Sequence, residues 1–476
     1  MTANFDPVGL TPIDHITAKV YLPYMLYFSS SDSSASIQTV RSGINKLINE
    51  LPWLAGDVVI HHAPETRAFI HPPATPPHQV PVLTVRHFDS DEDFRTHPTA
   101  EYLPVPLFVP ASEQRPVLRF QLNIFPTKVA LVMSFMHMAF DGSGAGTVLQ
   151  ALSECCRAAS AETQRESVPT PITENLARTA TALRNKVSAW PSKCETQLDH
   201  SVELGPPAFD SSFSIEQWGA VESALSSMSS SHRLTFSAEK LAELKGTCAK
   251  LLPQLGLASD TDSVVISSND IITAALGITL DRVVHADRDK QNNPTHMFMV
   301  ADMRRRISPP LPETYLGNMI YPLWSPIHCA PGPAQESNDS DNKQVDLDLH
   351  ALTHLAKHLR SKVTNDVNST LAHSCSAAVS SSGNWFQTEG KPADVVMTSW
   401  RHLKVFSLDF GPGLGYIEDF ESGFVMMPGA CIAMPARTRD GDLGKGKGVD
   451  WEVIVTVRPG DLEALVGDGL LRRILV

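Results

Sequence analysis

The sequence predicts a mixed α/β protein with large mixed sheets, organised as two domains. Segments of helical and of strand periodicity occur on both sides of a middle region rich in Ser, Pro and Thr. The chain has 476 residues, more than the roughly 250–300 at which one hydrophobic core stops growing. We therefore expect an N-terminal domain over residues 1–190, a crossover linker over 191–231 and a C-terminal domain over 232–476.

Four periodic patterns define the first half. Residues 39–51 and residues 143–159 repeat apolar side chains at helical spacing. Residues 117–125 alternate apolar with polar side chains, which predicts a half-buried strand. Residues 129–136 are apolar on both faces, as in the central strand of a sheet. The order predicted for this half is helix, strand, strand, helix.

Further patterns follow along the chain. Residues 174–187 have helical spacing, and residues 347–362 predict an amphipathic helix. Residues 451–457 read as a strand, and Asp461 is predicted to cap a final helix. Helices and strands are therefore expected in both domains.

Three segments are predicted to be loops. Residues 64–81 carry six prolines, and residues 331–344 are almost entirely polar. Residues 441–448 (GDLGKGKG) partly match the motif of a phosphate-binding loop, but Gly448 occupies the position where Ser or Thr would ligate magnesium. Because a strand pattern follows instead of a helix, this last segment is predicted to be a hairpin loop.

Composition argues against several classes of protein. The formal net charge of -13 disfavours nonspecific binding to nucleic acid. The longest apolar run, residues 129–140, is shorter than the roughly 20 residues that span a bilayer. The first twenty residues lack the features of a secretory signal, and the seven cysteines show no CxxC spacing. We expect a cytoplasmic protein with reduced thiols, no membrane insertion and no nucleic-acid partner.

The end of the predicted central strand carries the strongest chemical signal. His137 lies at the C-terminal end of an apolar strand, beside a turn of small residues. An imidazole on such a rigid element is suited to removing a proton near neutral pH, although a His there is often structural. Asp141 either orients this ring or holds the turn by pairing with a distant base, and the spacing does not decide between these roles.

Two other patterns are set aside. His350, His354 and His358 recur at every fourth residue, but the outer two lie roughly 12 Å apart along a helix, too far for one ion. No metal site is therefore expected. Ser143 follows Gly142 without the rest of a nucleophile elbow, which argues against a serine hydrolase.

Two motifs far apart in the chain resemble those of a known family. Residues 137–142 (HMAFDG) match an HxxxDG motif, and residues 409–413 (DFGPG) resemble DFGWG with Pro412 in place of Trp. Other matches keep the family order, at residues 10–14 (LTPID), 51–56 (LPWLAG), 267–274 (SSNDIITA), 302–306, 310–318 (PLPETYLGN) and 398–400 (TSW). The sequence thus resembles the BAHD acyltransferases, and looks closest to fungal members such as trichothecene 3-O-acetyltransferases.

The resemblance implies both a fold and an activity. The fold would be two chloramphenicol acetyltransferase-like domains, each a mixed sheet flanked by helices, with an active-site tunnel between them. The activity would be acyl-CoA-dependent, most simply O-acetylation of a hydroxylated secondary metabolite by a monomer. Acetyl-CoA would be a co-substrate, with no permanently bound cofactor. A CoA-independent condensation, cyclisation or isomerisation on the same fold is the alternative, and a non-catalytic homologue is a third.

The resemblance also assigns roles to residues. His137 would be the general base, and Asp141 would form a structural salt bridge with Arg304. Trp400, with Thr398 beside it, would donate its indole N–H to the oxyanion, although a core aromatic is an equal alternative. The expected catalytic set is therefore His137, Asp141, Thr398 and Trp400.

A second group of residues is implied to lie near CoA or to support the fold. Asp409 is expected to be structural, and Pro412 to stiffen its loop through a fixed φ. A basic patch is expected where the CoA phosphates enter, despite the acidic net charge. The residues implied to contact CoA are Gly142, Ser268, Gly411 and Gly413.

Overall fold

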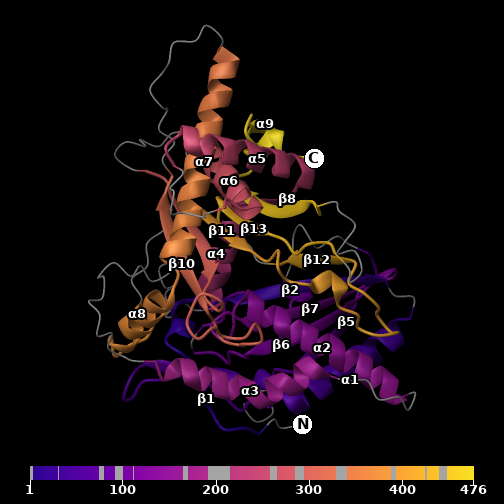
Figure 1. Ribbon diagram of the computed structural model, residues 1–476. Coiled ribbons are helices and arrows are strands. Elements are labelled where there is room, and N and C mark those ends of the chain that lie inside the picture. Colours follow the sequence, from indigo (N-terminus) through magenta and orange to yellow (C-terminus); the bar gives the residue numbers. More distant parts are fainter. Residues whose placement is uncertain are drawn as a thin grey trace.

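The structure is a computed structural model that describes most of the chain (Figure 1). The described residues are 4–29, 32–73, 80–91, 100–110, 112–163, 170–190, 215–257, 265–284, 294–327, 340–386, 393–423, 426–438 and 448–476.

The first large sheet has five strands in the order β12–β2–β7–β6–β5. Its strands are β2 (Tyr21–Ser29), β5 (Leu83–His87), β6 (Leu118–Ile124), β7 (Lys128–Met136) and β12 (Asp419–Ser422). Only β5 and β6 pair in parallel. Strand β7 is central and, after Lys128, fully buried, which confirms the prediction from its apolar sequence.

Three helices lie outside this sheet, on the side away from the other large sheet (Figure 1). They are α1 (Ser33–Glu50), α2 (Gly142–Thr163) and α3 (Pro171–Ser188). Helix α1 begins where the carboxylate of Asp32 accepts from the amide of Ala35. The apolar stripes of α1 and α2 form one core with β2, β6 and β7, so the predicted helical periodicities are confirmed.

The polar face of β6 is buried, so the expectation of a half-buried strand was wrong. Residues 102–108 cover this face with apolar side chains, and residues 101 and 102 supply backbone acceptors. The Asn123 amide donates to the carbonyl of Tyr102, and the Gln121 amide to that of Glu101. Arg119 donates to backbone carbonyls and pairs with Asp57. These polar side chains are tolerated inside because each is hydrogen-bonded.

The second large sheet has six strands in the order β10–β9–β11–β13–β14–β8. Its strands are β8 (Ser230–Phe236), β9 (His296–Asp302), β10 (Ile320–Pro326), β11 (Val395–Ser399), β13 (Ala430–Ala433) and β14 (Trp451–Val457). Strand β11 runs parallel to both of its neighbours, and the other pairs are antiparallel. Both large sheets are therefore mixed, as predicted.

The remaining helices follow α3 in the chain, and the first of them lies within the predicted linker 191–231. They are α4 (Ile215–Met228), α5 (Ala238–Gln254), α6 (Ser268–Val283), α7 (Ser340–Asn365), α8 (Ser369–Ser380) and α9 (Leu462–Gly467). Helix α6 is buried along almost its whole length between α7 and the six-stranded sheet. Helices α5 to α7 lie on the far side of that sheet from the first half (Figure 1).

The two halves are joined through β12. This strand comes from the second half of the chain but pairs with β2 in the five-stranded sheet. Arg233 in β8 contacts Asp419 and Glu421 in β12 and also Glu452 in β14. Arg437 bridges Asp419 and Glu452 in the same way. A charged network therefore connects the sheets along this edge.

A small third sheet corrects one predicted loop. Its order is β1–β4–β3, with β1 (Val8–Gly9), β3 (Asp57–His61) and β4 (Arg67–His71). Strand β4 lies inside residues 64–81, where the prolines predicted only a loop. Its alternate side chains Ala68 and Ile70 are buried, and the prolines flank the strand. Residues 74–79 lie outside the described part.

Three other predictions concern the cap at Asp461 and the loops at residues 331–344 and 441–448. The Asp461 side chain makes no capping bond to α9 and pairs with Arg458 instead. Helix α7 begins at Ser340, so the last five residues of the predicted loop 331–344 are helical, and residues 331–339 lie outside the described part. Residues 441–447, nearly all of the predicted hairpin loop, also lie outside the described part.

Among the described cysteines none forms a disulfide. No helix of the described chain is long and apolar enough to cross a membrane.

Candidate active site

The turn between β7 and α2 holds the predicted catalytic histidine. It contains only residues 137–141, because β7 ends at Met136 and α2 begins at Gly142. The His137 amide donates to the carbonyl of Val20 at 2.9 Å and extends the β2–β7 pairing by one residue. At the other end the Ala145 amide donates to the carbonyl of Asp141 at 2.8 Å. The turn is fixed by the strand before it and the helix after it.

The His137 side chain is only partly exposed to solvent. Burial lowers the pKa of its imidazole, and this effect is opposed by its own carbonyl, the charge of Asp141 and the neighbouring Asn318. Its Nδ1 atom is buried and has no hydrogen-bond partner among the described residues. A neutral imidazole is therefore favoured near pH 7, and a neutral ring is the form that accepts a proton.

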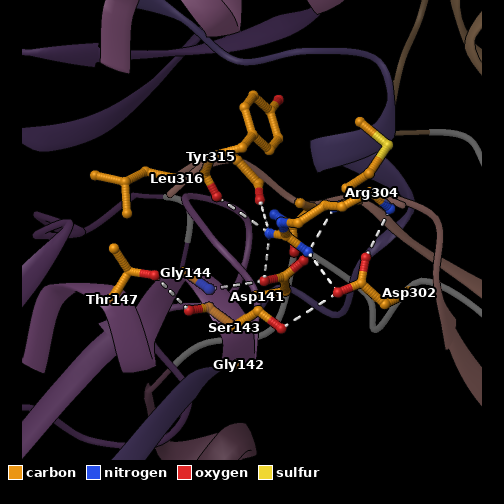
Figure 2. Close-up of polar contacts among 12 residues, drawn as sticks. Asp141, Gly142, Ser143, Gly144, Thr147, Asp302, Arg304, Tyr315 and Leu316 are labelled. Carbon is orange, nitrogen blue, oxygen red and sulfur yellow. Dashed lines mark hydrogen bonds and ion pairs between the residues drawn. The ribbon is translucent and has the colours of Figure 1, made fainter. Parts of the chain in front are cut away.

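Asp141 holds the turn and does not bond to the imidazole. Its Oδ1 accepts from Arg304 Nη2 at 2.8 Å and from the Gly144 amide at 3.0 Å, and its Oδ2 accepts from the Met319 amide at 3.0 Å (Figure 2). Burial alone would raise the pKa of this carboxyl, but Arg304 and the two amides hold it below its usual value. The structure thus contains the ion pair that the resemblance implied.

Arg304 links the His137 turn to residues 302–319 of the second half. It follows β9, and its Nη2 also donates to the carbonyls of Tyr315 at 3.2 Å and Gly317 at 2.9 Å. Its backbone amide donates to Asp302 Oδ1 at 2.8 Å (Figure 2). Asp302 Oδ2 in turn accepts from the hydroxyl of Ser143 at 3.5 Å. One buried guanidinium therefore organises residues 302–319 around the first turn of α2.

Trp400 and Thr398 reach the same region from β11. Thr398 lies within the strand, and Trp400 directly follows it and bonds to the carbonyl of Ala433. A Cβ added to Gly142 would lie 3.0 Å from Trp400 Nε1 and 3.0 Å from the Tyr24 hydroxyl. The indole is thus packed closely against the first residue of α2, and a larger side chain there would have to displace Trp400 and Tyr24 by a few tenths of an ångström. Its role toward an oxyanion stays a prediction.

The Asp409–Gly413 motif forms a tight turn away from His137. The Gly411 amide donates to Asp409 Oδ1 at 2.9 Å, and Gly411 has a φ of +86°, which suits glycine. Arg157 donates to the carbonyl of Asp409, and Ser36 to that of Gly413. Arg157 lies fifteen residues beyond Gly142 in α2, about 22 Å along the helix. The packing indicates a structural role, and CoA contact by Gly411 and Gly413 stays a prediction.

Ser268 is the first residue of α6 and is partly exposed. The preceding Ser267 caps the helix in a capping box with Asp270, and Arg360 pairs with that carboxylate. The negative charge of Asp270 is therefore already neutralised by Arg360. Contact of Ser268 with CoA stays a prediction.

Three buried residues that hold the His137 turn were not predicted from the sequence. Asp14, in the short 3-10 helix Ile13–Ile16, pairs with Arg184 of α3 at 2.9 Å. Arg184 Nη2 donates to the carbonyls of Ala139 at 2.7 Å and Leu316 at 2.9 Å. Asn318 joins the same cluster. Asp14 and Asn318 lie in the segments 10–14 and 310–318 that match the family, and this match could have indicated their importance. No local sequence pattern indicated Arg184.

The fold and this turn define the class of protein. A His and an Asp four residues apart, between a central strand and a helix of a two-domain mixed-sheet fold, are typical of the chloramphenicol acetyltransferase-like acyltransferases. The chain belongs to the Transferase family, the BAHD-type acyltransferases, which it matches over residues 85–468. The predicted family is therefore confirmed.

Relatives and solved structures are similar over nearly the whole chain. The fumigaclavine B O-acetyltransferase of Aspergillus fumigatus is 29% identical, with 98% of this chain and 97% of that protein covered. The communesin N16 acyltransferase of Penicillium expansum is 29% identical, with the same coverage. TRI101 of F. sporotrichioides, complexed with coenzyme A and T-2, has a TM-score of 0.72 at 19% identity over 99% of both chains. Vinorine synthase has a TM-score of 0.61 at 15% identity, over 99% of this chain and 94% of that one. These likenesses confirm the predicted two-domain fold.

Proposed function

We propose that this acyltransferase moves the acetyl group of acetyl-CoA onto a hydroxyl of a secondary metabolite. The observation that carries the proposal is His137, a partly exposed imidazole kept neutral by burial at the end of a rigid strand. Two relatives are O-acetyltransferases of fumigaclavine B, which supports the acceptor class, and the TRI101 structure contains coenzyme A, which supports the donor class.

The reaction follows from a neutral imidazole and needs no acyl-enzyme. His137 takes the proton of the acceptor hydroxyl as its oxygen attacks the thioester carbonyl carbon. The tetrahedral oxyanion collapses, the C–S bond breaks, and the CoA thiolate takes the proton back from the imidazolium. Trp400, with Thr398 next to it, is proposed to donate to the oxyanion. Asp141 acts through the backbone, because its oxygens are occupied by Arg304 and by amides.

The site is proposed to open into a tunnel between the two domains, 1–190 and 232–476. CoA would enter from one face and the acceptor from the other, and a basic patch would receive the CoA phosphates. We also expect the protein to act as a monomer in the cytoplasm. A CoA-independent reaction gains no support from Pro412, because the turn that contains it packs on α1 and α2 far from His137.

A CoA-release assay tests the proposal. Purified protein is mixed with acetyl-CoA and a panel of hydroxylated alkaloids and terpenoids, and free thiol and acetylated product are measured. The wild type should release CoA only with an acceptor present. His137→Ala should lower kcat by about 10²–10⁴, the range for losing a general base. His350→Ala, on the exposed face of α7, should leave kcat unchanged.

Two results would contradict the proposal. Full acetyl transfer by folded His137→Ala protein would remove the histidine from the mechanism. No acceptor-dependent CoA release by the wild type with any acyl-CoA would argue against the transferase activity with CoA thioesters.

A further inference from the structure

Two neighbouring strands of the six-stranded sheet end beside the first turn of α2. Strands β9 and β11 pair in parallel, so their carboxyl ends lie at the same edge of the sheet. Asp302 is the last residue of β9, and His402 lies three residues after the end of β11. Ser143, the second residue of α2, contacts both of these side chains. One residue of the first half is therefore held by two segments of the second half.

The contacts form a chain of hydrogen bonds. The Ser143 hydroxyl oxygen lies 2.9 Å from His402 Nε2 and 3.5 Å from Asp302 Oδ2, the second contact being drawn in Figure 2. A hydroxyl donates one proton, and a carboxylate only accepts. Both contacts are satisfied at once when His402 donates through Nε2–H and Ser143 donates to Asp302. From Asp302 the chain continues to Arg304, with Oδ2 and Nη1 3.3 Å apart, and so reaches the buried pair with Asp141.

This chain crosses between the halves where the indole of Trp400 packs on the first residue of α2. Gly142 directly precedes Ser143, and Trp400 lies two residues before His402. The space between Gly142 and the indole is narrow, because a Cβ added to Gly142 would lie 3.0 Å from Trp400 Nε1. The Ser143–His402 contact thus fastens the two chain segments that meet at the indole.

The arrangement does not fit a serine nucleophile. In a Ser–His–Asp hydrolase the carboxylate orients the histidine, and the histidine takes the serine proton. Here Asp302 contacts the Ser143 hydroxyl instead. A carboxylate beside the hydroxyl disfavours loss of its proton, because two negative charges would then lie together. The contact is therefore suited to holding position and not to covalent chemistry.

We propose that His402 is a positioning residue, which through Ser143 holds the Trp400 indole in place beside the first turn of α2 during acetyl transfer. The inference rests on the proposed function, in which this indole donates to the oxyanion. An oxyanion donor is effective only when its direction is fixed before the reaction. Loss of the His402 contact should therefore slow the chemical step and leave the binding of acetyl-CoA unchanged.

His402→Ala and Ser143→Ala each remove the contact from one side, and kcat for acetyl transfer is measured in both. Each kcat should fall roughly 3- to 10-fold, the range that corresponds to one hydrogen bond, while KM for acetyl-CoA stays the same. The double variant should be no slower than either single variant, because both changes remove the same contact. His402→Gln should restore most of the activity, because its amide can donate or accept near the place of Nε2.

The position of the indole is measured separately, by fluorine-19 NMR of protein that contains 5-fluorotryptophan. The chain has seven tryptophans, and the Trp400 resonance is assigned by its loss in Trp400→Phe. This resonance should shift in His402→Ala and return in His402→Gln. The measurement needs no acetyl transfer, so it tests the contact independently of the proposed function.

Lys404→Ala is the matched control. Lys404 lies two residues further along the same segment and is exposed, as His402 is. Its substitution leaves the Ser143–His402 contact intact, so its kcat and its Trp400 resonance should match the wild type. The Tm of every variant is recorded to show that the protein is folded.

Wild-type kcat in folded His402→Ala would overturn the proposal, and so would a lowered kcat with an unshifted Trp400 resonance. Additive losses in the double variant would also contradict it, because the two residues would then act separately. If His402→Ala does not fold, Ser143→Ala gives the same test from the other side of the contact. A wild type that transfers no acetyl group would instead contradict the proposed function, and the Trp400 resonance would still decide whether His402 holds the indole.

Discussion

At the scale of single residues, the proposed mechanism requires His137 to remain uncharged. Burial disfavours the charged ring and lowers its pKa below the ordinary 6.5. The base is active only when neutral, so activity is lost as pH falls through this lowered pKa. The acidic limb of kcat/KM for acetyl transfer should therefore lie below pH 6.5, with a plateau through neutral pH. A limb above pH 6.5, measured with a pH-stable acceptor, would contradict this environment for His137.

Gly142 is the second residue at which a small change should matter. In Gly142→Ala the new methyl group would press on the Trp400 indole and the Tyr24 hydroxyl, each 3.0 Å away. Displacement at a reacting centre costs up to about 10²-fold, so kcat should fall well below wild type while the protein remains folded. Gly246→Ala in α5 is the control, because a Cβ there meets nothing within 4 Å. Unchanged kcat in Gly142→Ala would show that Trp400 and Tyr24 tolerate displacement.

At the scale of elements, the buried pair Asp141–Arg304 joins α2 to the segment after β9. Removing one partner of a buried pair leaves an uncompensated charge, so Arg304→Met should lower the free energy of unfolding by about 3–5 kcal/mol. The neighbouring Arg305 pairs with Glu313 at the surface, and Arg305→Met should cost only about 0–1 kcal/mol. Denaturant unfolding of both variants gives the comparison. Equal stabilities would mean that the buried pair contributes nothing.

The same pair predicts how stability responds to acid. Asp141 has a folded-state pKa below the ordinary value of 3.8, so its contribution is present above that pH and is lost as pH falls through the folded pKa. Wild-type stability should therefore fall more steeply in acid than that of Arg304→Met, in which this contribution is reduced. Parallel acid-unfolding curves for the two proteins would argue against the linkage.

Elements were predictable where the pattern of side chains was local. Helices α1 and α2 and strands β7 and β14 follow the periodicities of their own sequences. Strand β6 shows the limit, because its alternation is real but its polar face is covered by residues 102–108. Asp461 shows another, since its carboxylate pairs with Arg458 in place of capping α9. Local patterns give the type of element, and its neighbours decide what each face contacts.

At the scale of the whole molecule, CoA binding should stabilise the folded state without depending on chemistry. A ligand that binds only the folded protein adds about 2.7 kcal/mol at a hundredfold excess over its Kd. Acetyl-CoA should therefore raise Tm in the wild type and equally in His137→Ala, as measured by calorimetry. If only the wild type were stabilised, His137 would have a binding role that the proposed mechanism does not give it.

The sequence alone determined the class of fold, the family and the position of His137 at the end of a central strand, because these depend on local periodicity and on motifs that are contiguous in the chain. The resemblance also supplied Arg304 as the partner of Asp141. Tertiary structure decided which groups surround the turn. Asp14 and Asn318 are 304 residues apart yet share a hydrogen bond, and β12 crosses into the sheet of the other half. A buried polar group is stable only with its partner, and a partner so distant in the chain leaves no local pattern to find.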